Sequence, residues 1–403
     1  MKYDFTTIMN RFGEDAIAVD LPASRTGGYA DIHLHEGFDI IPMWVADMNF
    51  PVLPDIQEAM ITRIQKPHFG YFSARDEYFD AIIRWQKQRN HVEGLEKKHI
   101  GYENGVLGGV TSAMNILTSK GGKVLVHSPV YVGFSHVLNN NGYQIIQSPL
   151  VKDESNVWRM DFEDMERKLR DEHIHTAIFC NPHNPCGRAW EKEEIEQAMA
   201  LYEKYEVEVI SDEIWSDLVH HGHQHIPTQS VSPYAHEHTI AFYAPSKTFN
   251  LAGLIGSYHI VYNAKLRDRL EKEGSLSHYN SMNLLSMYAL IGAYGDNGME
   301  YVRQLNHVFE ENIDYAVDFI ENRLPGVSVC SPKATYMLWI DVSGYLENAG
   351  TDLDTLIHRG YDYGVIWQDG RGFFGQTNIR MNLALPLCRV KEAFERLQKY
   401  VFI

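Results

Sequence analysis

The chain has 403 residues, of which 44% are hydrophobic and 22% are charged, and its formal net charge is −17. This length is enough for two domains or for one large α/β unit. The acidic charge argues against a general affinity for nucleic acid or for an anionic membrane. No apolar run is long enough to span a membrane, and the first residues lack a secretory signal pattern. The four scattered cysteines form no CxxC pair, so we expect a protein of the reducing cytoplasm.

The first fifty residues have little hydrophobic periodicity before the stretch IIPMWVADMNFP at 40–51. A segment without a period of its own gains its order by packing against another part of the protein. We therefore expect residues 1–50 to form an arm that packs with a small C-terminal domain.

Between residues 100 and 262, short apolar runs alternate with helical patterns. Several runs lack polar alternation, as expected for strands that are covered on both faces. Strands that alternate with helices predict a parallel sheet built from βαβ units, and we expect residues 51–290 to form a large domain around it. The runs are KVLVHSP (123–129), YQIIQSP (143–149), TAIFCNP (176–182), VEVISDE (207–213), TIAFYAPS (239–246) and GSYHIVY (256–262).

The last third of the chain opens with a long amphipathic pattern, YVRQLNHVFEENIDYAVDFIENRL at 301–324. Apolar residues at helical spacing predict one long helix here. A mixed α and β pattern follows it. We expect residues 291–403 to form a second, smaller α+β domain.

Polar side chains stand just after three of the predicted strands. These are Asn184 in TAIFCNPHNPCG, Asp212 in VEVISDEIW and Lys247 in TIAFYAPSK. Ligands gather at the carboxyl ends of the strands of an open α/β sheet, so the three can share a site. Lys247 is the most demanding of them, because burying an ammonium costs several kcal/mol unless it is paired or neutralised.

Each of the three residues also has an ordinary structural explanation. Turns rich in Pro and Gly form without any ligand, and strand-end aspartates often cap helices. Most lysines simply lie at the surface. The three together, in this order, favour a shared functional site.

The order of these motifs resembles the fold-type I family of pyridoxal phosphate (PLP) enzymes, the aspartate aminotransferase superfamily. The resemblance covers about residues 35–395 and implies an α/β fold of the PLP-dependent transferase type, with a mostly parallel seven-stranded sheet and a smaller α+β C-terminal domain. It implies that Lys247 forms a Schiff base with the cofactor aldehyde, that Asp212 faces the pyridine nitrogen and that Asn184 bonds the ring hydroxyl. The chemistry agrees, because a carboxylate in a low-dielectric pocket favours the protonated nitrogen that makes PLP an electron sink.

The same resemblance assigns the cofactor phosphate to a Gly-rich turn before a helical pattern, ENGVLGGVTSAMNIL. Backbone N–H groups at the start of a helix favour an anion, although a plain strand–helix turn has the same appearance. The residues assigned to the phosphate are Gly105, Val106, Leu107 and Ser246.

Two tyrosines and one arginine complete the implied site. Tyr131 in SPVYVGF matches the aromatic residue that stacks on the cofactor ring, although a lone aromatic residue more often belongs to the core. Tyr71 matches a tyrosine that reaches the phosphate of the neighbouring subunit, which implies a homodimer with shared active sites. Arg380 matches the arginine that forks onto the substrate α-carboxylate, a bidentate contact that lysine cannot reproduce. Asn184 is expected to contact the substrate as well.

Finer features resemble the MalY/PatB group of carbon–sulfur β-lyases within this family. WVADMNF at 44–50 and GHQHIP at 222–227 are the most specific of them. Two positions depart from the aminotransferase pattern. Trp215 stands where aminotransferases carry a tyrosine, and Ile255 stands where they carry an arginine that binds phosphate.

The segment HHGHQH at 220–225 has four histidines, which could suggest a metal site. No second group of ligands at a fixed spacing accompanies it, so we expect no metal.

The resemblance implies a reaction: α,β-elimination of cystathionine, or of a related cysteine S-conjugate, to pyruvate, ammonia and a thiol, as in methionine biosynthesis. Lys247 would act as the general base, and Tyr131, Tyr71 or Lys247 itself would protonate the leaving sulfur. A transaminase would share all these residues. A regulatory protein on the same fold is a third possibility, although the chain keeps both Lys247 and Asp212.

Overall fold

The computed structural model describes residues 1–276 and 279–403. They divide into two compact units. One unit comprises residues 52–184 and 188–303, and the other comprises residues 1–51, 185–187 and 304–403. None of the helices in the described part of the chain is long and apolar enough to cross a membrane.

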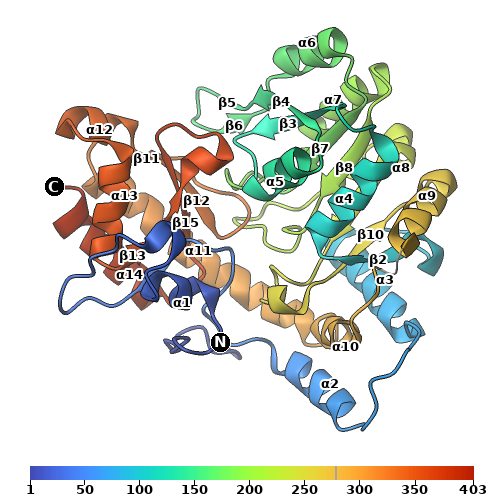
Figure 1. The fold of residues 1–403 in the computed structure, drawn as a ribbon, viewed down its shortest axis with the longest axis horizontal. Helices are drawn as coiled ribbons and strands as arrows, with labels where there is room; N and C mark the ends of the chain where they lie inside the picture. Colours follow the sequence, from blue (N-terminus) through green and yellow to red (C-terminus); the bar gives the residue numbers. More distant parts are fainter. Residues whose placement is uncertain (277–278) are drawn as a thin grey trace. The chain divides into compact units, whose positions relative to one another are not determined.

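The first unit is built on a seven-stranded sheet (Figure 1). Its order is β2-β10-β9-β8-β7-β3-β4, and every neighbouring pair from β9 to β4 is parallel. Strand β10 runs antiparallel to both of its neighbours. The strands are β2 (Ile100–Asn104), β3 (Lys123–Ser128), β4 (Gln144–Pro149), β7 (Thr176–Cys180), β8 (Glu208–Asp212), β9 (Thr239–Tyr243) and β10 (Gly256–Ile260).

The apolar runs of the sequence explain the centre of this sheet. All five residues of β7 and all five of β9 are buried, as both faces of the sheet are covered. All six runs predicted from the sequence contain a strand, so the prediction of a mostly parallel sheet is confirmed.

Strand β2 has no counterpart among the predicted runs. Its sequence, IGYEN, is too polar to indicate a buried strand. The structure makes Glu103 acceptable there because the His259 ring of β10 lies 2.7 Å from its carboxylate, and both side chains are buried. The pairing partner, which lies far away in the sequence, makes this segment a strand.

Helices connect the strands of the first unit. Helix α6 begins at an N-cap, Asp161, whose side chain accepts from the Asp164 N–H at 3.0 Å. Helix α7 begins at a capping box formed by Glu191 and Glu194. The helices are α2 (Pro54–Ile64), α3 (Asp76–Asn90), α4 (Val106–Leu117), α5 (Val132–Asn140), α6 (Phe162–Glu172), α7 (Lys192–Lys204), α8 (Pro233–His238), α9 (Ala264–Ser275) and α10 (Leu284–Ala293), and a short hairpin joins β5 (Val151–Lys152) to β6 (Trp158–Arg159).

The second unit holds a four-stranded antiparallel sheet in the order β11-β12-β15-β14. Its strands are β11 (Ser328–Val329), β12 (Met337–Asp341), β14 (Gln368–Asp369) and β15 (Asn378–Asn382). Its helices are α1 (Ile17–Ala23), α12 (Ser343–Ala349), α13 (Leu353–Asp362) and α14 (Leu387–Arg396), and α11 (Gly298–Arg323) begins in the first unit and ends in this one.

The N-terminal residues are part of this second unit. Strand β1 (Ile41–Pro42) pairs in parallel with β13 (Val365–Ile366). The Asn49 N–H donates to the carbonyl of Ala384 at 2.9 Å. The unit boundaries, at residues 51 and 303, are close to the domain limits predicted from the sequence, at 50 and 290, and those limits stay a prediction.

One glycine shows how tightly α4 packs on the sheet. A Cβ atom on Gly109 would lie 2.4 Å from the ring of Phe242 in β9, whereas one on the adjacent Gly108 would meet nothing closer than 3.8 Å.

We expect Gly109→Ala to lower the free energy of unfolding by about 1–3 kcal/mol, because the ring has no space to retreat. The matched change Gly108→Ala should be neutral or stabilising by up to about 1 kcal/mol. Denaturant unfolding of the cofactor-free chain measures both, and equal effects of the two changes would contradict the packing argument.

Candidate functional site

The three predicted polar residues follow three adjacent strands of the seven-stranded sheet. Asn184 follows β7, Asp212 is the last residue of β8 and Lys247 follows β9. Main-chain contacts fix the register at this edge: Asp212 lies opposite Cys180 on one side and Phe242 on the other. The structure therefore brings these residues to one edge of the sheet, the edge where open α/β sheets bind ligands.

Asp212 is a buried carboxyl group. Its side chain accepts a hydrogen bond from the backbone N–H of Ile214 at 3.0 Å, and the residue is 4% exposed. Burial raises the pKa of Asp212 to about 7, and the nearby charge of Lys247 opposes this rise. A carboxyl group in this state gains from a cationic partner, which the protonated ring nitrogen of PLP would supply.

Lys247 lies in a turn that follows β9 and is half-buried. The turn is closed by two backbone bonds, from the Phe249 N–H to the Pro245 carbonyl at 2.9 Å and from the Leu251 N–H to the Ser246 carbonyl at 3.0 Å. The lysine Nζ lies 5.7 Å from the centre of the Trp215 ring. Trp215, which departs from the aminotransferase pattern, thus contacts the lysine directly.

The N-terminus of α4 offers backbone donors. The helix begins at Val106, and its first N–H groups have no acceptor within the helix. The Gly105 N–H is used differently, since it donates to the Glu103 carbonyl at 2.9 Å. Gly105 has φ = 74°, a conformation that favours glycine. A Cβ atom on it would lie 3.8 Å from Ile255, which is itself left-handed at φ = 63° and 59% exposed.

Tyr131 lies beside this helix terminus. It caps the N-terminus of α5, and its ring stands edge-on to Phe134 at 5.5 Å. A Cβ atom on Gly133 would lie 2.5 Å from the Tyr131 ring and 2.8 Å from the Leu107 side chain. The glycine thus lets Tyr131 and the start of α4 approach each other.

Tyr71 is not brought to this group within the chain. Its side chain is fully exposed, on the connection between α2 and α3. This connection rises at the lower right of the view, well apart from β7 and β8 (Figure 1).

Arg380 belongs to the second unit, in β15, and is 3% exposed. Its guanidinium donates to the carbonyl of Trp44 at 3.1 Å and to the side chain of Gln368, and it lies 4.7 Å from the centre of the Phe373 ring. Two residues after Arg380 on the same strand, the Asn382 side-chain amide donates to the carbonyls of Val45 and Asp47, both at 2.7 Å. Strand β15 thus shapes the WVAD loop that the sequence singled out.

The sequence did not reveal the role of Glu213, which follows Asp212. This side chain is fully buried, and each of its oxygens has two donors. Oε1 accepts from the Ser211 hydroxyl at 2.9 Å and from the Thr228 N–H at 3.0 Å, and Oε2 lies 2.6 Å from both His225 Nε2 and the Tyr243 hydroxyl. His225, one of the clustered histidines, is therefore a partner of Glu213.

No group of three or more potential metal ligands occurs among the described residues. The histidine segment at 220–225 thus has a structural explanation in part, through the contact between His225 and Glu213.

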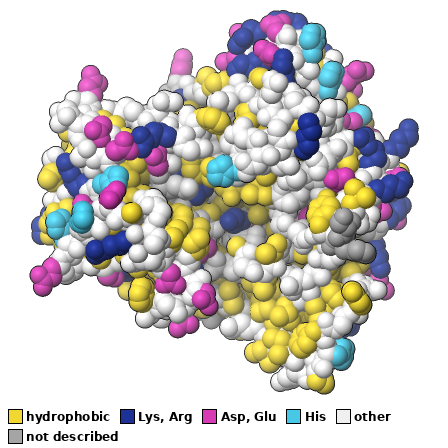
Figure 2. All heavy atoms as spheres, in the orientation of Figure 1, with side chains coloured by type: hydrophobic (Ala, Val, Ile, Leu, Met, Phe, Trp, Pro, Cys, Tyr) yellow, Lys and Arg dark blue, Asp and Glu magenta, His cyan; other side chains and the backbone are white. Residues whose placement is uncertain are grey.

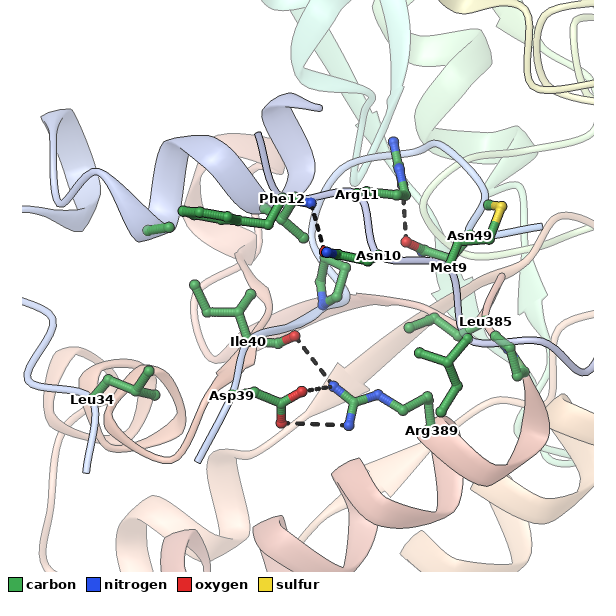
Figure 3. A pocket seen from close by; sticks show the side chains of 15 residues that line it. Met9, Asn10, Arg11, Phe12, Leu34, Asp39, Ile40, Asn49, Leu385 and Arg389 are labelled. Carbon is green, nitrogen blue, oxygen red and sulfur yellow. Dashed lines mark hydrogen bonds and ion pairs between the residues drawn. The ribbon is translucent and has the colours of Figure 1, made fainter. Parts of the chain in front are cut away.

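The second unit has a cavity of about 400 Å³ between its N-terminal segment and the start of α14 (Figure 3). Its walls are mostly apolar, and at one side the Asp39 carboxylate accepts from Arg389 at 2.7 Å. None of the described residues that line it was predicted to hold cofactor or substrate.

The residues at the strand ends fit PLP. A lysine, a buried carboxyl group with a raised pKa, an amide and a helix N-terminus are the chemical groups that this cofactor requires. Together with the mixed seven-stranded sheet, they define a protein of the PLP-dependent transferase fold.

The comparison with known families agrees. The model of the aminotransferase class I and II family matches residues 39–397, and the chain belongs to this family. The predicted fold, which is like that of aspartate aminotransferase, is confirmed. The prediction of pyridoxal 5′-phosphate as the family's cofactor is confirmed as well, since class I and II aminotransferases use it.

The chain is similar to three named proteins of the predicted branch. It is 32% identical over 362 residues to the cystathionine beta-lyase PatB of Bacillus subtilis. This alignment covers 89% of this chain and 92% of PatB. It is 28% identical over 399 residues to the protein MalY of Escherichia coli. This alignment covers 97% of this chain and 96% of MalY. The PLP-bound C-S lyase from Staphylococcus hominis has a TM-score of 0.88 at 30% identity and covers 99% of this chain and 98% of that chain. The resemblance to the MalY/PatB group is thereby confirmed, and the roles of the individual residues stay predictions.

The raised pKa of Asp212 gives a pH dependence that can be measured. Between pH 4 and pH 7, roughly, the folded cofactor-free chain keeps a proton on Asp212 that the unfolded chain releases. The stability that this group contributes is complete below its unfolded pKa of 3.8 and is lost as the pH rises through about 7. Because Asp212→Asn cannot titrate, its thermal unfolding midpoint should fall less over this range than that of the wild-type chain. Parallel midpoints in the two proteins at every pH would contradict the raised pKa.

Proposed function

We propose that the protein is a PLP-dependent carbon–sulfur β-lyase that cleaves cystathionine or a related cysteine S-conjugate to pyruvate, ammonia and a thiol. The observation that carries the proposal is the set of Asn184, Asp212 and Lys247 at the ends of three adjacent strands. The similarity to PatB and to the C-S lyase from Staphylococcus hominis, at about 30% identity, supports this branch of the family.

Residues of the first unit would hold the cofactor. Lys247 would bind its aldehyde carbon, Asp212 its ring nitrogen, Asn184 its ring hydroxyl and Tyr131 the face of its ring. Bound PLP supplies an electron sink that stabilises negative charge on the α-carbon of the amino acid. The phosphate would lie against the backbone of Gly105, Val106 and Leu107 and the hydroxyl of Ser246.

In this proposal Lys247 is the general base. Its amine, set free when the amino group of the substrate takes its place on the aldehyde carbon, would take the proton from the α-carbon, and the nearby Asp212 would compensate the charge of a protonated ring nitrogen. The carbon–sulfur bond would then break with its electron pair on sulfur, which would take a proton from Tyr131, Tyr71 or Lys247. The remaining three-carbon fragment would be released and would react with water to give pyruvate and ammonia.

Arg380 would bind the substrate carboxylate, with Asn184 as a second contact. A guanidinium presents two parallel donors to a carboxylate, which fixes the direction of the bond from the α-carbon to its proton. This assignment is supported by the buried position of Arg380 and by its bonds to Trp44 and Gln368, which hold the guanidinium in one orientation.

Replacing Lys247 tests the assignment of the base. We expect Lys247→Ala to lose the visible absorbance of the bound cofactor and to lower the rate of pyruvate formation by about 10²–10⁴-fold or more. Lys247→Arg is the control that keeps a cation but offers no free amine. Pyruvate formation at a wild-type rate by either variant would exclude Lys247 as the base.

An aminotransferase of the same fold is the second candidate, and the family as a whole favours it. Trp215 and Ile255 argue against it, because both depart from the aminotransferase pattern.

One experiment separates the two reactions. Purified protein is supplied with cystathionine, and pyruvate and free thiol are measured; it is then supplied with an amino acid that has no β-leaving group. A lyase releases thiol in the first case, whereas a transaminase forms a keto acid and converts its cofactor to the amine form in the second.

A homodimer with shared sites is part of the proposal. Tyr71 is fully exposed in the single chain, so it is available to a neighbouring subunit. Hydrophobic side chains gather over α2 and α10 at the lower edge of the same face (Figure 2). Ile61 and Ile64 of α2, and Phe69 in the connection after it, are each at least half exposed. An exposed apolar patch of this kind marks an interaction surface.

Mixing of subunits tests the sharing of sites. We expect Tyr71→Ala and Lys247→Ala each to be inactive as pure proteins. After unfolding and refolding together, each hybrid dimer should contain one site with both residues intact, and activity should return. An inactive mixture that does form hybrid dimers would contradict a shared site, and so would full activity of Tyr71→Ala alone.

A further inference from the structure

The turn that follows β8 contacts the lysine segment at two points. Residues 213–218 are folded by backbone bonds from Ser216 to Glu213 at 3.0 Å and from Leu218 to Trp215 at 2.9 Å. The Trp215 ring lies beside the Lys247 amine. Two residues further on, the Asp217 carboxylate accepts a hydrogen bond from the hydroxyl of Thr248 at 2.9 Å. The second contact therefore falls on the residue directly after the lysine.

Asp217 is a buried carboxylate, 3% exposed, and it is held from several sides. Its Oδ2 accepts from Thr248, and its Oδ1 accepts from the indole N–H of Trp85 at 3.1 Å. Arg89 supplies the opposite charge, with its Nε 3.4 Å from Oδ1 and its Nη2 donating to the Asp217 carbonyl at 2.9 Å. Because these hydrogen bonds share one buried carboxylate, removing one partner is expected to weaken or shift its bonds to the other partners.

Trp85 and Arg89 lie one turn apart on α3, which gives the lysine segment a rigid support. The Trp85 ring is stacked on Tyr294 with centroids 4.4 Å apart and an angle of 2° between the planes. It also packs against Phe249, the second residue after Lys247, at 5.7 Å. Thr248 and Phe249 are both fully buried. Both residues that follow the lysine are therefore held in place, Thr248 by its hydrogen bond to Asp217 and Phe249 by the packing of its ring on Trp85 of α3.

We propose that Asp217 is a positioning residue for Lys247, acting through the Thr248 hydroxyl. The inference rests on the proposed function, in which Lys247 carries the cofactor and moves the proton. A lysine side chain has four flexible bonds, so the direction of its amine depends on the backbone from which it starts. Asp217 holds that backbone on one side of the lysine, and the Trp215 ring of the same turn lies beside the amine, with its centre 5.7 Å from Nζ. Displacement of a reacting group by about 1 Å can cost a factor of 10² in rate, so a small shift here is measurable.

Thr248→Val is the variant that tests the proposal. It has the shape of threonine without the hydroxyl, and Asp217 keeps Trp85 and Arg89 as partners, so the chain is expected to fold. Asp217→Asn is less suitable alone, because it also leaves Arg89 without its opposite charge. Thr248→Ser restores the hydroxyl. Thr239→Val is a matched control, since Thr239 is a buried threonine at the other end of β9 whose hydroxyl has no hydrogen-bond partner among the described residues.

The proteins are compared after loading with PLP, by four measurements: kcat and KM for cystathionine, the rate of cofactor release, the pH dependence of the visible absorbance and the thermal unfolding midpoint. For Thr248→Val we expect kcat to fall by about 10-fold or more, KM to change by less than about 3-fold and cofactor release to accelerate. The midpoint of the absorbance titration should move by about half a pH unit or more, since the surroundings of the lysine nitrogen change. Thr248→Ser and Thr239→Val should behave like the wild-type protein.

The possible results distinguish a failure of the proposed function from a failure of the positioning role of Asp217. If the wild-type protein binds no PLP, the proposed function itself fails. If the wild-type protein is active and Thr248→Val matches it in kcat, in cofactor release and in titration midpoint, the positioning role of Asp217 is wrong. A lower unfolding midpoint of Thr248→Val with an unchanged titration and an unchanged kcat would likewise overturn it, because it would show a purely structural contact.

Discussion

The structure depends on one electrostatic constraint, the burial of an acidic side chain beside a lysine at the carboxyl edge of the sheet. Asp212 is almost inaccessible, and burial raises its pKa to about 7. Such a group destabilises the folded chain at neutral pH unless a cation compensates it. Lys247 compensates it in part, and a protonated ring nitrogen would complete the compensation. The same burial that costs stability thus prepares the site for its cofactor.

A second layer of polar groups keeps this edge in place. Asp212 and Glu213 are neighbours, so they point to opposite sides of the strand end. Glu213 binds Ser211 on its own side and joins β9 and the segment at 225–228 through Tyr243, His225 and Thr228. A buried network in which every oxygen is satisfied is rigid, and this network fixes the strand end from which Asp212 projects.

In the second unit, too, buried polar side chains hold a segment in place, and here their acceptors are backbone carbonyls. Arg380 and Asn382, on one strand, hold the WVAD loop through the carbonyls of Trp44, Val45 and Asp47. Arg11 adds an ion pair to Asp47 at 2.6 Å. The carbonyls of residues 44–47 are thus bound by side chains more than three hundred positions away in the sequence, and local periodicity cannot indicate such partners.

The sequence by itself determined the central strands and the identity of the key residues. Runs such as TAIFC and TIAFY are buried on both faces, so their composition alone indicates strands. Asn184, Asp212 and Lys247 were identified because each follows such a run. Only the tertiary structure decided that IGYEN is a strand, that His225 binds Glu213 and that Asp217 binds Thr248. Each of these depends on a polar pair between distant segments, and local periodicity carries no information about which distant partner will satisfy a buried polar group.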